Sequence, residues 1–148
     1  MLTLEIADAI VDDALREGAR LGLKPLAVAV VDSGGHVIVA KRQDRCSYLR
    51  VDIARAKAWG ALGLGFGTRA IAKAANTTHG PMMSAVNNLS GGLVIPSPGG
   101  VIIADAEGHF IGAIGISGDL GEKDEVAALA AVANAGFVGI PGYPGDQT

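Results

Sequence analysis

The chain has 148 residues, a formal net charge of −3, 49% hydrophobic residues and 4% aromatic residues. This length suits one domain with its own hydrophobic core. The acidic balance and the scarcity of aromatic rings argue against a nucleic-acid surface, and no apolar run approaches the roughly 18 residues of a membrane-spanning helix.

The N-terminal part of the chain predicts a helix followed by two strands. Apolar residues recur at helical spacing after Thr3, whose hydroxyl makes it a suitable N-cap, and Gly22 ends this helix. Residues 26–32 form a continuous apolar run, which predicts a strand buried on both faces. A glycine-containing turn follows, and residues 37–41 predict the returning strand.

A repeat relates this segment to a later one. Residues 28–40 reappear at residues 101–113, and six of the thirteen positions are identical. Each copy is an apolar run, a polar turn with glycine and a second apolar run, which is typical of a β-hairpin. Ancestral duplication and chance likeness between hairpins explain the repeat equally well. In either case two hairpins predict an α/β fold in which helices cover one antiparallel sheet.

The rest of the chain predicts short helices and a C-terminal tail. Helices are expected over residues 48–62, 68–75, 81–87 and 122–135. The Gly- and Pro-rich loop of residues 90–100 suggests a short strand at 93–95. Residues 139–148 carry too much Gly and Pro for regular structure. We therefore predict one domain over residues 1–138 and a tail over 139–148.

Six motifs point to a known family. They are AVVDSGG at 29–35, RQD at 42–44, ARAKA at 54–58, PGGVI at 98–102, GHFIGAIGISG at 108–118 and EKDE at 122–125. Together they resemble the haem-binding GlcG/HbpS-like family, which includes the C-terminal domain of PduO-type proteins. The resemblance runs from about residue 3 to residue 136. Two features depart from the family pattern: Ile102 replaces a proline, and Arg45 and Cys46 replace small residues.

The resemblance implies a fold, an assembly and a range of ligands. The implied fold is an α/β sandwich whose antiparallel sheet has about five strands. The implied assembly is a homo-oligomer, from a dimer to an octamer. Some members bind haem, some are linked to iron and some accompany catabolic enzymes. Under the haem interpretation, the resemblance places Gly99 and Gly100 beside the cofactor.

His79 is the candidate axial ligand of a haem. It lies between two predicted helices, and Met82 and Met83 follow it closely. A haem iron takes a nitrogen or sulfur donor beside an apolar slot. The alternative is that His79 is an ordinary turn residue. His36 and His109 occupy equivalent positions in the two hairpin turns, so we expect both to face solvent.

Lys57 is the second candidate, because it interrupts a small, apolar helical stretch. It either extends to solvent or contacts an anionic ligand, and the family carries a lysine here. With Arg42 and Asp44 it would form a site for a haem propionate or a small organic acid. If buried, Lys57 would have a lowered pKa and could act as a general base.

Two further groups are weaker candidates. Glu122 and Glu125 share one helix face and are candidate ligands of ferric iron or another hard cation. The alternative is that they complement the positive end of the helix. Cys46, the one cysteine, cannot form an intramolecular disulfide, and its basic neighbours favour a thiolate.

Three functions are compatible with these residues. The first is a small homo-oligomer that binds haem or a similar apolar ligand with carboxylates. The second is a cofactor-independent lyase or isomerase that acts on a small organic acid through Lys57, Arg42 and Asp44. The third is a structural partner in a larger catabolic complex. The opening residues carry an acid early and no basic region, so we expect no signal peptide and a cytoplasmic location.

Overall fold

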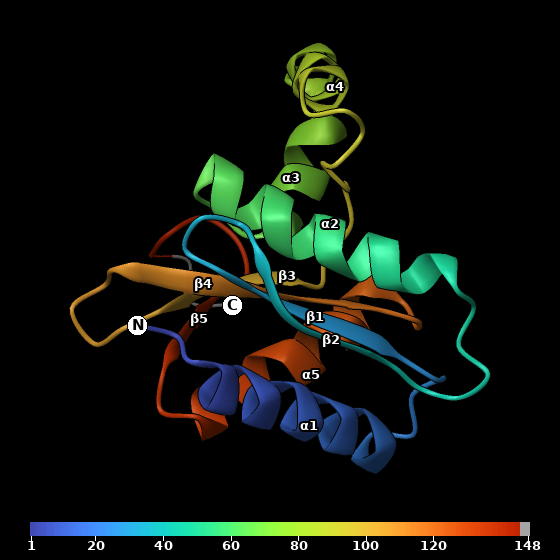
Figure 1. Cartoon of the computed structure of the whole chain (residues 1–148). Coiled ribbons are helices and arrows are strands. Elements are labelled where there is room, and N and C mark those ends of the chain that lie inside the picture. Colours follow the sequence, from blue (N-terminus) through green and yellow to red (C-terminus); the bar gives the residue numbers. More distant parts are fainter. Residues whose placement is uncertain (146–148) are drawn as a thin grey trace.

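The computed structural model describes residues 1–145 and forms a three-layer α/β sandwich (Figure 1). Its elements in chain order are α1 (Leu4–Arg20), β1 (Ala27–Asp32), β2 (Val37–Arg42), α2 (Leu49–Leu64), α3 (Thr68–Ala75), α4 (Gly80–Leu89), β3 (Gly100–Ala104), β4 (Phe110–Ser117), α5 (Gly121–Asn134) and β5 (Val138–Ile140). Among the described residues, no helix is long and apolar enough to cross a membrane.

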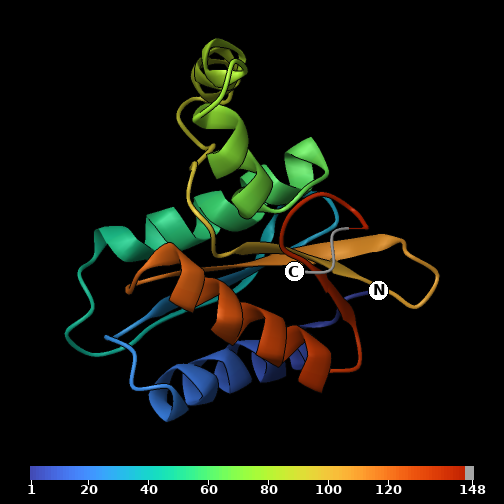
Figure 2. The same cartoon turned by 180° about the vertical axis from the view of Figure 1, so that it is seen from behind.

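Helices cover both faces of the sheet. α1 and α5 lie side by side on one face, and α2 lies on the other (Figures 1 and 2). α3 and α4 extend beyond α2, away from the sheet, and form an arm. We call α3 and α4 the arm below.

The two sequence repeats form the two central hairpins of the sheet. In the described chain the strand order is β2-β1-β4-β3-β5, and all neighbours are antiparallel. β1 and β4 join the hairpins, with Val28 opposite Ile116 and Asp32 opposite Gly112. Both hairpin turns therefore lie at the same end of the sheet. The predicted fold class is confirmed.

The two turns have the same backbone hydrogen bonding. In the first, Oδ1 of Asp32 accepts the backbone N–H groups of Gly34 and His36 at 2.9 and 3.0 Å. In the second, Oδ1 of Asp105 accepts those of Glu107 and His109 at 3.0 and 2.8 Å. A glycine with positive φ follows the aspartate in each turn. The repeated aspartate and glycine thus have a structural cause.

The two faces of the sheet are packed differently. Large aliphatic side chains such as Ile10, Val30 and Ile114 fill the space between the sheet and α1 and α5. On the other face α2 approaches through alanines and glycines. A Cβ on Gly115 would lie 1.8 Å from the carbonyl oxygen of Ala54. The backbone of α2 therefore rests directly on β4.

Most predicted elements are confirmed, and two expectations are wrong. Thr3 caps α1 by accepting the N–H of Ile6 at 3.2 Å. Residues 93–95 form no strand; the N–H of Val94 bonds instead to the side-chain amide oxygen of Asn87 at 3.2 Å.

The second error concerns the expected C-terminal tail. Residues 138–140 form β5 on the open edge of β3, with Ile140 opposite Ile102. The carbonyl groups of Pro141 and Gly142 then accept N–H groups from the start of α3. A free strand edge supplies backbone partners even to a Gly-rich segment. Residues 146–148 of the expected tail lie outside the described residues.

Candidate functional site

The α4 helix carries an exposed apolar stripe that begins at a histidine. His79 is the N-cap of α4, and Met82, Val86 and Leu89 follow at spacings of three and four residues. This spacing places the four side chains on one face of the helix. Met82 is 62% exposed and Leu89 is 88% exposed. We call these four residues the α4 stripe.

A cavity lies between the arm and α2. Its volume is about 290 Å³, and its lining includes Trp59 and Leu64 from α2, Val86 and Leu89 from α4, and Val94 from the following loop. Half of the α4 stripe therefore contributes to an apolar cavity. His79 and Met82 lie at the other end of the same stripe, where both are exposed.

Met83 lies on a different side of α4 from Met82. It lines a smaller cavity of about 110 Å³ together with Ile71 and Ala75 of α3. Met83 thus contributes to the contact that holds α4 on α3. The sequence placed both methionines beside His79, and the helix separates them.

Lys57 is buried among protein groups. Its ammonium donates to the carbonyl oxygen of Ile116 at 2.8 Å and lies 3.5 Å from Oδ2 of Asp124. Burial lowers the pKa of Lys57, although the nearby carboxylate opposes this shift. Burial also raises the pKa of Asp124 to about 6, against the effect of the Lys57 charge. For both side chains desolvation outweighs their mutual attraction.

Gly99 and Gly100 pack against the same lysine. A Cβ on Gly99, whose φ is +118°, would lie 2.9 Å from the ammonium nitrogen of Lys57. A Cβ on Gly100 would lie 2.4 Å from the Lys57 carbonyl oxygen. Both glycines are buried. The close approach of β3 to α2 therefore accounts for the glycine pair.

Arg42 and Asp44 lie together, apart from the buried ammonium of Lys57. They line an open cavity of about 540 Å³ with Ala19, Leu23 and other residues. The Arg42 guanidinium donates to the carbonyl oxygen of Cys46 at 2.6 Å. The cavity walls are therefore made without Lys57, which faces Ile116 and Asp124.

The expected thiolate at Cys46 is not supported. Cys46 is buried, and burial raises the pKa of its thiol. Arg42 and Arg50 act in the opposite direction, but their effect is smaller. The side chain packs with Ala27 and Ala29 of β1. The neutral thiol therefore behaves as a small apolar side chain.

The candidate acidic pair at the start of α5 is divided between two environments. Glu125 is buried and accepts a hydrogen bond from Nε of Arg69 at 3.1 Å. Glu122 is exposed. Arg69 therefore already balances the charge of Glu125.

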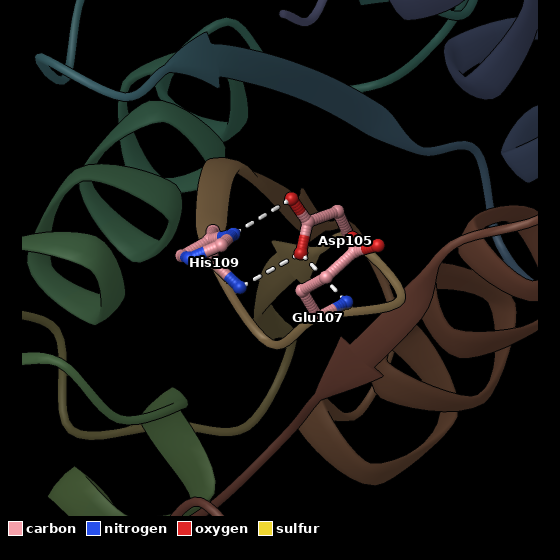
Figure 3. A group of neighbouring side chains, drawn as sticks. All are labelled: Asp105, Glu107 and His109. Carbon is pink, nitrogen blue, oxygen red and sulfur yellow. Dashed lines mark hydrogen bonds and ion pairs between the residues drawn. The ribbon is translucent and has the colours of Figure 1, made fainter.

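Both hairpin histidines are exposed as expected: the side chain of His36 is 83% exposed and that of His109 is 77% exposed. The structure adds one group that sequence reasoning missed. Asp105, Glu107 and His109 hold their donor atoms within 4.8 Å of one another (Figure 3). The alternation of Asp, Glu and His over five positions was the available signal.

Comparison with known proteins places this geometry in context. A family model described as haem degrading protein, HbpS-like, matches residues 2–133. Among curated proteins, none matches the chain. The chain is thus similar over almost its whole described length to a family of haem degrading proteins.

Solved structures share the fold. The Klebsiella pneumoniae protein ORFY is 26% identical and has a TM-score of 0.82, over 90% of this chain and 90% of that chain. A double mutant of HbpS from Streptomyces reticuli is 28% identical, with a TM-score of 0.77, over 90% of this chain and 86% of that chain. PduOC, solved in complex with haem, has a TM-score of 0.80 at 24% identity, over 90% of this chain and 94% of that chain. The likeness to PduOC shows the fold.

Proposed function

This chain belongs to the HbpS-like family of haem degrading proteins, and we propose that it binds haem against the α4 stripe. The observation that carries this proposal is the stripe itself. An exposed imidazole and three exposed or half-exposed apolar side chains share one face of α4. A haem needs an axial donor beside an apolar surface, and the stripe provides both.

The residues present fit one side of a haem. His79 would supply the axial nitrogen, and Met82 and Val86 would contact the porphyrin. The cavity between α2 and α4, about 290 Å³, is just smaller than the roughly 300 to 1,000 Å³ typical of ligand sites. One chain therefore leaves part of a porphyrin uncovered. When bound, the haem would supply a redox-active iron.

We further propose that a second copy of the chain covers the other side of the haem. The arm extends away from the sheet (Figure 1), and every residue of α4 is at least partly exposed. Within one chain much of the apolar area of the α4 stripe stays exposed, and contact between two copies would bury it. This agrees with the homo-oligomer that the family resemblance implies.

The test is a titration of the purified protein with ferric haem, followed by absorption in the Soret region. We expect binding with a Kd in the micromolar range or tighter. Replacing His79 with alanine removes the axial nitrogen, so His79→Ala should shift the Soret band and weaken binding at least tenfold, about 1.4 kcal/mol. The variant's circular dichroism should match that of the wild type, because His79 is exposed.

The matched control is His36→Ala, which removes another exposed histidine, from a hairpin turn. It should leave the Soret band and the affinity unchanged. An unaltered spectrum in His79→Ala would exclude His79 as the ligand. Absence of binding at tens of micromolar haem, which corresponds to about −6 kcal/mol, would exclude the haem function.

A further inference from the structure

The second hairpin turn gathers three side chains that can bind a metal ion. Glu107 and His109 lie beside the Asp105 carboxylate (Figure 3), and the donor atoms of the three residues are all within 4.8 Å of one another. Oδ2 of Asp105 lies 3.1 Å from Nδ1 of His109. Two donors bound to one ion at about 2.1 Å each are separated by a similar distance.

The two carboxylate oxygens of Asp105 have different partners. Oδ1 of Asp105 accepts the backbone N–H groups of Glu107 and His109, and this fixes the carboxylate in place. Oδ2 is left to face the imidazole. A carboxylate held by backbone donors on one oxygen is oriented for an ion on the other.

The first hairpin shows that the turn can form without the Glu107 carboxylate and its charge. Asp32 makes the same two backbone hydrogen bonds, and His36 also lies beside it. Gly34 occupies the position that Glu107 occupies in the second turn. Glu107 therefore adds a carboxylate to a turn that forms without it.

We propose that Asp105, Glu107 and His109 bind a divalent transition-metal ion at the tip of the second hairpin. The imidazole favours ions such as Zn²⁺ over Mg²⁺ and Ca²⁺, which prefer oxygen ligands alone. Three protein donors leave at least one position for water, as in open zinc sites. Glu107 is exposed, so its side chain can rotate to bring the widest pair of donors to the roughly 3.4 Å that separates two ligands of a tetrahedral ion.

Calorimetric titration of the full chain with Zn²⁺, without haem, tests the site. The wild type should bind one ion per chain with a micromolar Kd. His109→Ala should weaken binding at least tenfold, and Glu107→Gly, which introduces the glycine that the first turn has at this position, should weaken it several-fold. Gly34→Glu adds the missing carboxylate to the first turn and should raise the stoichiometry to two. The turn should tolerate this residue, because the nearest contact of an added Cβ is the side chain of His36, at 3.0 Å.

Two control variants separate this site from the other histidines. His36→Ala and His79→Ala should bind Zn²⁺ as the wild type does, and the second of these also keeps the result independent of the proposed haem site. The proposal is overturned if the wild type binds no Zn²⁺ below 1 mM, roughly −4 kcal/mol. It is equally overturned if His109→Ala binds normally, if His79→Ala loses the ion, or if Gly34→Glu leaves the stoichiometry at one.

Discussion

At the scale of single residues, burial decides the chemistry of the charged groups in the core. Lys57 and Asp124 lie 3.5 Å apart, with side chains 4% and 1% exposed. The carbonyl of Ile116 and the backbone N–H of Asp119 complete their hydrogen bonding. Within the described residues, no buried side-chain nitrogen or oxygen lacks a partner. The Lys57 ammonium is therefore hydrogen-bonded within the interior of the fold.

The raised pKa of Asp124 predicts a pH dependence of stability. Its folded-state pKa of about 6 exceeds the ordinary value of 3.8, so the folded state binds more protons between these two values. The stability that protonated Asp124 contributes is present below about pH 4 and is lost as the pH rises through 6. The loss amounts to about 3 kcal/mol.

Urea unfolding of the wild type and Asp124→Asn at several pH values measures this effect. Asparagine cannot ionise, so from pH 4 to pH 7 the wild type should lose stability relative to the variant. Taking the difference between the two proteins removes the contributions of the other carboxylates. If the free energy of unfolding of the wild type instead rises relative to that of the variant over this range, the Lys57 ion pair outweighs desolvation.

At the scale of elements, the position of α2 depends on the small residues beneath it. Gly115 and Gly100 let the backbone of α2 contact β4 and β3 directly. This contact sets the depth at which Lys57 enters the core and the direction in which α2 leads to the arm. The helix itself has little amphipathic character in its sequence, because its buried residues are four alanines, Gly60 and Lys57.

Gly115→Ala should therefore destabilise the protein by about 1 to 3 kcal/mol, as overpacking of a close contact does. The added Cβ would meet backbone atoms of Ala54 and Ala58, which can yield only if α2 moves. Gly63→Ala is the control on the same helix. No atom lies within 4 Å of a Cβ there, so this change should stabilise the helix by roughly 0.5 to 1 kcal/mol. Urea denaturation compares the two, and equal stability in both variants would contradict the close-contact interpretation.

At the scale of the whole molecule, the arm is the part of the chain that we propose contacts a second copy. We expect light scattering near neutral pH to show at least a dimer, whereas one chain has a mass of 14.9 kDa. Leu89→Asp places a charge in the α4 stripe and should lower the observed mass, because a buried charge is costly at an interface. Leu120→Asp, at a residue 63% exposed before α5, is the control and should leave the mass unchanged. A wild type that remains monomeric at high micromolar concentration would contradict the proposed assembly.

The sequence by itself determined most of the elements and the pairing of strands within each hairpin. Local signals sufficed for these: the Thr3 cap, the Gly22 stop and the repeated Asp and Gly of the two turns each act within a few residues. The apolar run of residues 26–32 likewise indicated a buried strand, and burial of β1 confirms it. The exposure of His36 and His109 followed from their place in the turns.

The tertiary structure alone decided which distant groups meet. Lys57 and Asp124 are 67 residues apart, and nothing local to either shows that the start of α5 comes within reach of the Lys57 side chain. β5 formed because β3 offered an open edge, a feature of the sheet that the composition of residues 138–140 does not contain. Met82 and Met83 are neighbours in the chain, yet the helix turns them to different sides. Contacts of this kind depend on how elements pack, and packing is fixed by the whole chain.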